Sequence, residues 1–136
     1  MKKKVLFVCT HNSARSQMAE GILRATYGDY YTVYSAGTHP ATVNRYAVAV
    51  MKEIGIDISS HRSKSVEELG EKDFDVVVTV CDSAKESCPY IPGAKKYLHK
   101  SFEDPSAAKG EEEEVIEVFR KVRDEIKSWI EKEFSP

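Results

Sequence analysis

The fold of this chain is decided by residues 5–16, which read VLFVCTHNSARS. The apolar run that ends at Cys9 is short and partly β-branched, and a polar loop follows it, so the run predicts a buried parallel strand. After the loop, apolar residues recur at helical spacing from Met18 to Leu23, and Gly28 provides a stop signal. The loop is therefore expected to lead from the carboxyl end of a strand into the N-terminus of a helix.

The loop of residues 10–16 has the chemistry of an anion site. Successive backbone N–H groups and the positive end of a helix dipole attract a tetrahedral oxyanion. Arg15 adds a guanidinium fork that can hold two oxygens at once. Cys9 would lie at the floor of the loop, where positive surroundings favour a nucleophilic thiolate. The plainer alternative is that Cys9 is only a buried strand-end cysteine and Arg15 a surface residue of the helix.

The composition predicts one globular domain over residues 1–136, long enough to bury a sheet with helices packed on it. Hydrophobic residues make up 41% and charged residues 31%, which is typical of soluble globular proteins. The net charge of −2, with no basic stripe, argues against a nucleic-acid partner. The apolar run after Lys4 is too short for a signal peptide or a membrane span, so a cytoplasmic protein is expected.

Three cysteines, Cys9, Cys81 and Cys88, carry the remaining chemical signal. In a reducing compartment they are more consistent with catalysis or redox chemistry than with a structural framework, and their spacing predicts no metal site. Cys81 follows an apolar run just as Cys9 does. In open α/β sheets, functional groups collect at the carboxyl ends of the strands.

The remaining elements follow from periodicity and stop signals. Strands are expected at 31–37, at 74–80 in the centre of the sheet and, as an edge-like strand, at 94–99. Helices are expected at 43–54, from Ser65 to near Gly70, in a short turn at 84–86, and at 111–134. This alternation predicts an α/β fold: a single-domain open sheet of about four parallel strands flanked by helices on both faces. Cys9, Cys81 and the loop of Asp104 would then share one rim.

Four segments together resemble the thioredoxin-coupled arsenate reductases, which have the fold of the low-molecular-weight protein tyrosine phosphatases. They are VCTHNSARSQMAE at 8–20, YSAG at 34–37, VTVC at 78–81 with Cys88-Pro89, and EDP at 103–105. The resemblance covers nearly the whole chain, and the three cysteines are more specific than the first loop. Two departures matter. Many members have Gly where this chain has His11, and a second loop cysteine where it has Ala14.

The resemblance implies a mechanism for arsenate reduction. Cys9 attacks arsenic, Asp104 protonates the departing oxygen, Cys81 then attacks Cys9 to release arsenite, and Cys88 attacks Cys81. Thioredoxin reduces the resulting Cys81–Cys88 disulfide, so no cofactor is implied, and a monomer with weak phosphatase side activity is expected. The segment 82–87 is expected to be mobile. The implied oxyanion-binding residues are Thr10, His11, Asn12, Ser13, Ala14, Arg15 and Ser16.

Three further residues are implied to support the loop: Glu20, Ser35 and Lys64. Family members that hold a potassium ion there use side chains matching Asn12, Glu20 and Ser35, with an acidic residue where this chain has Lys64. The ammonium group of Lys64 is therefore expected to replace the cation and to hydrogen-bond Asn12 and Glu20. The Ser16 hydroxyl is a candidate hydrogen-bond partner of the Cys9 thiolate. His39, His61 and His99 are expected to be ordinary surface or loop histidines.

Two other functions remain open at this point. A protein tyrosine phosphatase would use Cys9, Arg15 and Asp104 alone, but Ser106-Ala107-Ala108 offers no tyrosine pair to wall a phosphotyrosine slot. A thiol redox sensor would bind or oxidise once, without catalytic release of arsenite. Stoichiometry distinguishes the sensor from either enzyme.

Overall fold

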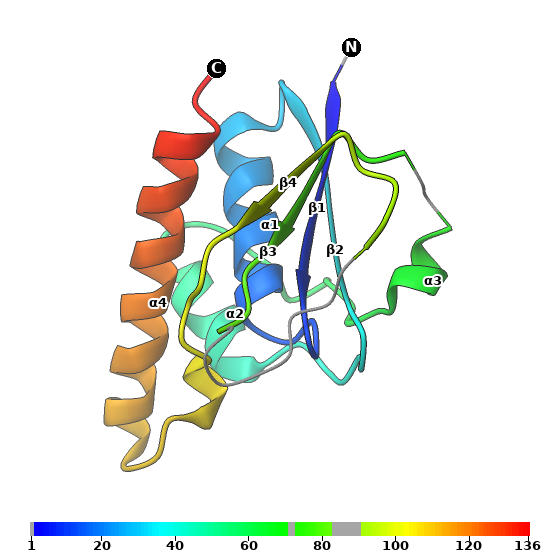
Figure 1. The fold of residues 1–136 in the computed structure, drawn as a ribbon. Coiled ribbons are helices and arrows are strands. Elements are labelled where there is room, and N and C mark those ends of the chain that lie inside the picture. Colours follow the sequence, from blue (N-terminus) through cyan, green and yellow to red (C-terminus); the bar gives the residue numbers. More distant parts are fainter. Residues whose placement is uncertain (1, 71–72, 83–90) are drawn as a thin grey trace.

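The computed structural model describes residues 2–70, 73–82 and 91–136. Four parallel strands form one open sheet in the order β2-β1-β3-β4 (Figure 1). Cys9 at the end of β1 pairs with Gly37 at the end of β2. All carboxyl ends therefore lie along one edge of the sheet, as predicted. The strands are β1 (Lys3–Cys9), β2 (Tyr31–Gly37), β3 (Val76–Thr79) and β4 (Lys96–His99).

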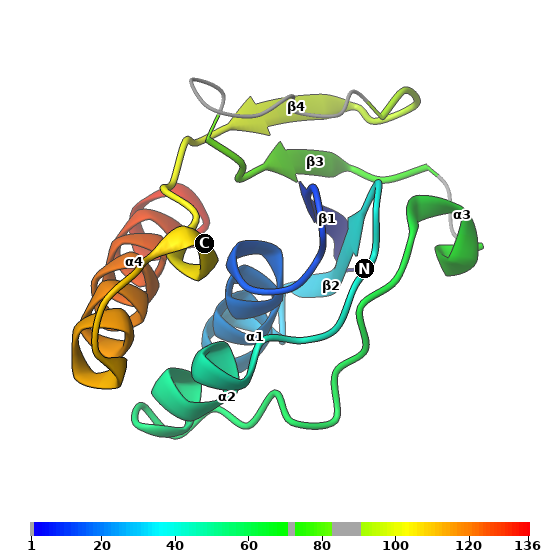
Figure 2. The same cartoon turned by 90° about the horizontal axis from the view of Figure 1, so that it is seen from below.

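Helices flank both faces of the sheet, but unequally. Figure 2 shows α1, α2 and α4 on one side and the short α3 on the other. The helices are α1 (Arg15–Tyr27), α2 (Arg45–Lys52), α3 (Val66–Leu69), the 3-10 helix η1 (Pro105–Ala107) and α4 (Glu112–Glu133). Within the described ranges, none of these helices is long and apolar enough to cross a bilayer.

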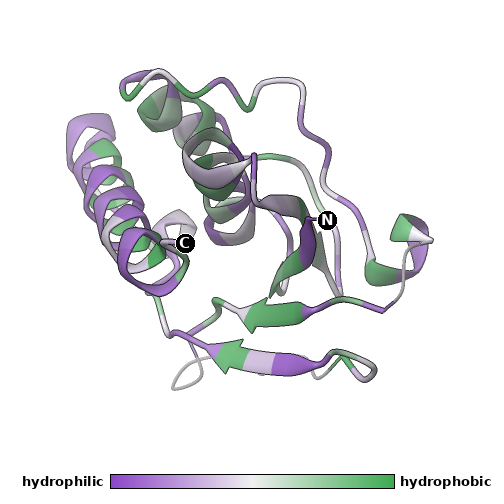
Figure 3. Ribbon diagram, turned by 90° about the horizontal axis from the view of Figure 1, so that it is seen from above, coloured by the Kyte–Doolittle hydropathy of each residue, from purple (hydrophilic) through white to green (hydrophobic). Residues whose placement is uncertain are grey.

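The alternation of side chains along β1 divides the core in two. Val5 and Phe7 pack with buried residues of α1, α2 and α4, whereas Leu6 and Val8 belong to a smaller cluster that α3 partly covers. The helix α4 turns an apolar stripe inward and a polar surface outward (Figure 3). This packing buries β1 from Val5 to Cys9.

Most of the predicted elements are confirmed, including β4 as an edge strand and β3 between β1 and β4. The short helix after Ser65 is confirmed too: the Ser65 hydroxyl caps it, and it ends at Gly70 in the left-handed region. The predicted turn at 84–86 lies outside the described residues. The helix η1 was not predicted. Asp104 caps it and Pro105 begins it, an arrangement that the Asp-Pro pair favours.

Glu53, at the end of α2, fastens this helix to α4. Its carboxylate accepts hydrogen bonds from Arg120 and Arg123, at 2.6 Å and 2.8 Å for the shortest contact of each. The hydrogen bonds from Arg120 are the main reason that the pKa of Glu53 falls to about 2. A carboxylate with a lowered folded-state pKa stabilises the fold above its unfolded pKa. That stabilisation is lost as the pH falls through the folded pKa.

We therefore expect Glu53→Gln to lower Tm at pH 7, and the difference from wild type to shrink as the pH falls from about 4.5 toward 2. Thermal unfolding followed by circular dichroism over this pH range tests it. The matched control is Glu131→Gln, which removes an exposed pair with Lys127 within α4. An equal loss of Tm at pH 7 and pH 3 would show that the charge of Glu53 is not the cause.

Candidate active site

The carbonyls of the loop between β1 and α1 are occupied by hydrogen bonds within the protein. The carbonyls of Thr10, His11 and Ser13 accept backbone N–H groups from the segment 39–44, and those of Asn12 and Ala14 are also bonded. Because a trans peptide points its N–H away from its C=O, each of these peptides turns its N–H away from the group that bonds its carbonyl. The N–H groups of residues 11–15, at the N-terminus of α1, are therefore expected to form the ring of donors that an oxyanion needs.

Gly37, at the end of β2, lets this loop pack tightly on the sheet. A Cβ at this position would come within 2.6 Å of the Thr10 carbonyl oxygen and 2.9 Å of the Asn12 nitrogen. Any side chain here would displace the loop. The sequence YSAG at 34–37 thus ends in the residue that the site requires.

Asn12 fixes the shape of the loop. Its φ of 50° lies in the left-handed region, which Asn tolerates better than most residues. Its buried amide donates to Ser16 Oγ (2.8 Å) and Ser35 Oγ (3.0 Å), and it accepts from Gln17 Nε2 (2.9 Å) and the backbone N–H of Lys64 (3.1 Å). Both donors and both acceptor positions are therefore satisfied.

The Cys9 thiol is free, buried and 2.9 Å from the Ser16 hydroxyl. Ser16 Oγ accepts from Asn12, and its own hydrogen can donate to the sulfur when Cys9 is a thiolate, which can only accept. A donor at this position stabilises a thiolate. The expected contact between Ser16 and Cys9 is thus present.

Arg15 reaches from the start of α1 to the loop before η1. Its guanidinium donates to the Phe102 carbonyl (3.2 Å) and lies 3.7 Å from Asp104 Oδ2, and only 3% of the side chain is exposed. The alternative of Arg15 as a surface residue is therefore wrong. Cys9, Arg15 and Asp104 line one small hollow of about 10 Å³, together with His11, Ser13, Ala14 and Ser106.

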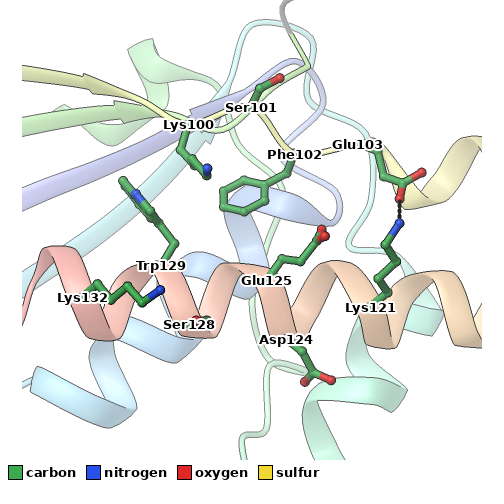
Figure 4. A pocket seen from close by; sticks show the side chains of 10 residues that line it. All are labelled: Lys100, Ser101, Phe102, Glu103, Lys121, Asp124, Glu125, Ser128, Trp129 and Lys132. Atoms are coloured by element: carbon green, nitrogen blue, oxygen red, sulfur yellow. Dashed lines mark hydrogen bonds and ion pairs between the residues drawn. The ribbon is translucent and has the colours of Figure 1, made fainter.

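The segment 100–103 is anchored on α4, which positions Asp104. The Phe102 ring is buried and meets Trp129 edge-on at 6.2 Å, and Glu103 pairs with Lys121 at 3.1 Å. Figure 4 shows these residues around a surface cavity of about 750 Å³ between this segment and α4. Phe102 also supplies the carbonyl that accepts from Arg15. The contacts between this segment and α4 therefore fix the positions of both Arg15 and Asp104.

A second cavity, of about 560 Å³, adjoins the hollow and shares His11 and Asp104 with it. His11 Nδ1 lies 3.0 Å from the His39 carbonyl, which can only accept, so Nδ1 carries the hydrogen. The Nε2 atom is then an acceptor in the neutral ring, so it can contact a protonated oxygen of an anion. The departure at His11 thus adds a side-chain donor or acceptor beside the site.

The three expected loop-supporting residues lie together beneath the loop. The Ser35 hydroxyl bonds Glu20, whose other carboxylate oxygen accepts from Arg24 at 2.6 Å. Lys64 Nζ lies 3.5 Å from Ser35 Oγ and 3.8 Å from Glu20 Oε1. Two details of the prediction are wrong, because the ammonium group hydrogen-bonds neither Asn12 nor Glu20. Asn12 receives the backbone N–H of Lys64, Glu20 is an ion-pair partner only, and the ammonium group donates to the Arg62 carbonyl (3.0 Å).

Gln17 and His61 extend this network, although no pattern in the local sequence indicates either of them. Gln17 Nε2 bonds Asn12 and the Arg62 carbonyl, and Gln17 Oε1 lies 3.0 Å from His61 Nδ1. His61 lies in a loop as expected, but it is half-buried and not an ordinary surface residue. Burial lowers its pKa, Glu20 opposes this, and Arg24 adds to it. Because His61 lies 44 residues after Gln17 in the sequence, no local pattern indicates this contact.

Cys81 is fully buried two residues after the end of β3, on the rim where β1 ends at Cys9. The following residue, Asp82, lines the 560 Å³ cavity with Thr10 and Asp104. Cys81 is disulfide-bonded, whereas Cys9 is free. Cys88 and most of the segment 82–87 lie outside the described residues.

Comparison with known proteins agrees with this geometry. The family model of low molecular weight phosphotyrosine protein phosphatases matches residues 4–134. The chain belongs to this family. Within it, the chain is similar to an arsenate reductase of Halalkalibacterium halodurans, with 49% identity over 92% of this chain and 90% of the relative.

Two solved structures of arsenate reductases are similar to this chain. An arsenate reductase in the phosphate binding state superposes with a TM-score of 0.82, at 35% identity over 96% of this chain and 95% of the other. The thioredoxin-dependent arsenate reductase of Corynebacterium glutamicum gives a TM-score of 0.59, at 29% identity over 93% of this chain and 61% of the other. The predicted fold class, a four-stranded parallel open sheet of this phosphatase family, is confirmed.

Proposed function

We propose that this protein is an arsenate reductase of the thioredoxin-coupled type, with arsenate as substrate and reduced thioredoxin as electron donor. The observation that carries the proposal is the Cys9 thiol at the centre of a preformed anion loop, with Cys81 on the same rim. The identity of 49% to an arsenate reductase supports arsenate over a phosphate ester. Coupling to thioredoxin requires a compartment that keeps thiols reduced, and we therefore assign the protein to the cytoplasm.

The first step makes a bond from sulfur to arsenic. The ring of N–H groups and Arg15 hold the arsenate oxygens, and the Cys9 thiolate attacks arsenic. Asp104 protonates the departing oxygen, which leaves as water. The product is a covalent Cys9–arsenic adduct in which arsenic is still +5.

The next steps move two electrons. The Cys81 thiolate attacks the Cys9 sulfur, the S–As bond breaks, and its electron pair reduces arsenic to +3, which is released as arsenite. Cys88 then attacks Cys81, freeing the Cys9 thiolate. Thioredoxin reduces the Cys81–Cys88 disulfide and is itself oxidised, so the cycle is balanced.

A coupled assay tests the function directly. Arsenate, thioredoxin, thioredoxin reductase and NADPH are combined with the protein, and both NADPH consumption and released arsenite are measured. We expect many arsenite molecules per protein molecule. Release of one equivalent at most would support the redox sensor instead. An aryl phosphate run in parallel separates a phosphatase, for which the small residues 106–108 offer no aromatic wall.

We also infer that Lys64 takes the place of a bound cation beneath the loop. Its ammonium group already lies next to Glu20 and Ser35, so a potassium ion does not fit beside it without like-charge repulsion. Burial lowers the pKa of Lys64, while Glu20 favours its charged form. Glu20 thus counters the burial cost of an ammonium charge that lies beside the side chains supporting Asn12.

Wild-type activity and Tm are therefore expected to be equal in sodium and potassium salts at matched ionic strength. Lys64→Asp should make both potassium-sensitive, with Tm higher by ~3 °C at potassium a few-fold above its Kd. Thermal unfolding and the coupled assay in each salt provide the measurements. Lys52→Asp, at the exposed end of α2, is the control and should respond equally to both salts. Clear stabilisation of the wild type by potassium would contradict the inference.

A further inference from the structure

Ser106 makes the two oxygens of the Asp104 carboxyl group inequivalent. Its backbone N–H (3.0 Å) and its hydroxyl (2.6 Å) both donate to Asp104 Oδ1. The other oxygen, Oδ2, lies 3.7 Å from the guanidinium of Arg15. Ser106 and Asp104 both line the hollow of Cys9 and Arg15. One carboxyl oxygen is thus held by η1, and the other faces the anion-binding guanidinium.

We propose that Ser106 is a positioning residue for the acid step, and that it assigns the transferred proton to Asp104 Oδ2. The proposal rests on the proposed role of Asp104 as proton donor. Since Oδ1 accepts two hydrogen bonds, the proton of the neutral acid is carried by Oδ2. It passes from Oδ2 to the oxygen that leaves arsenic, and the carboxylate regains a proton from solvent. Without the hydroxyl, the nearly twofold terminal torsion of aspartate would let the two oxygens exchange places.

A purely structural role would need only part of this arrangement. The backbone N–H of Ser106 suffices for Asp104 to cap η1. The same Asp-x-Ser turn occurs at Asp57, where Oδ1 accepts the backbone N–H of Ser59 at 2.8 Å. Hydrogen bonds from Ser59, first that of its side chain, lower the pKa of Asp57. Ser59 is exposed and lines neither cavity of the site. It is therefore a matched control for the loss of one hydroxyl.

The test measures arsenite formation in a single turnover of prereduced protein, which excludes the thioredoxin step. Ser106→Ala is expected to slow this turnover about 10-fold, which is less than the full contribution of a general acid. The KM for arsenate in the coupled assay should stay within about 2-fold of wild type. Ser106→Thr keeps the hydroxyl and should restore most of the rate. Ser59→Ala should react at the wild-type rate. A wild-type rate for Ser106→Ala would overturn the proposal.

A double-mutant cycle separates this proposal from the one on which it rests. Asp104→Asn alone is expected to slow the single turnover about 100-fold, and adding Ser106→Ala should have no further effect. A further 10-fold loss in the double variant would show that Ser106 acts independently of Asp104, and would overturn the positioning role alone. A wild-type rate for Asp104→Asn would instead remove Asp104 as the acid, and the role of Ser106 with it.

Discussion

Replacing Cys9 by serine is expected to lower arsenate reduction by about 10⁴-fold or more, to the background of the coupled assay. A hydroxyl is a far weaker nucleophile than a thiolate at neutral pH. The loss should extend to any hydrolysis of an aryl phosphate, because both reactions begin with attack by the same atom. The rates of arsenite release and of phosphate release measure the two effects.

The variant is also expected to keep its anion site. The backbone N–H ring and Arg15 do not depend on sulfur, so Cys9→Ser should still bind phosphate, measured by calorimetry, and should unfold near the wild-type Tm. Arg15→Lys provides the converse control: it keeps Cys9 but loses the bidentate fork and the bond to the Phe102 carbonyl, and should bind phosphate more weakly. Arsenite release by Cys9→Ser at the wild-type rate would exclude Cys9 as the nucleophile.

The other two cysteines are expected to fail at different steps. Cys81→Ser should release no arsenite, because nothing attacks the Cys9–arsenic adduct. Cys88→Ser should release one equivalent and then stop, because Cys81 completes its attack but the resulting disulfide is not passed on. Both variants should keep any weak phosphatase activity, which needs no electrons. Arsenite counted per protein molecule, with and without thioredoxin, distinguishes the two variants from each other and from the wild type.

Cys81 is fully buried, so its replacement requires a check on folding. Cys81→Ala, which adds no polar group to the core, should behave as Cys81→Ser does in the assay. Sustained arsenite turnover with thioredoxin in both Cys81→Ala and Cys88→Ser would contradict the relay, even if Cys9 is essential.

Local sequence was sufficient to predict the frame of the site. The switch from an apolar run to helical spacing around Cys9 predicted β1, the loop and α1, because periodicity reports which face of an element is buried. Gly37 likewise marked the end of β2, where the Thr10 carbonyl leaves no room for a Cβ. Ser65 and Gly70 marked the ends of α3, since capping depends on residues only a few positions apart. The loop residues themselves were predicted from the same short stretch.

Only the tertiary structure decided how the site is held. Arg15 donates to the Phe102 carbonyl, 87 residues away in the sequence, and Gln17 contacts His61, 44 residues away. These contacts form because α4 and the segment 39–64 pack around α1 and the loop. The Asp-x-Ser turn at Asp104 is local, but only the fold brings Asp104 Oδ2 to within 3.7 Å of the Arg15 guanidinium. Such contacts depend on the relative positions of whole elements, which come from packing the core and leave no fixed spacing in the sequence. The chemistry of this site was therefore set by its local sequence, and its geometry by the fold around it.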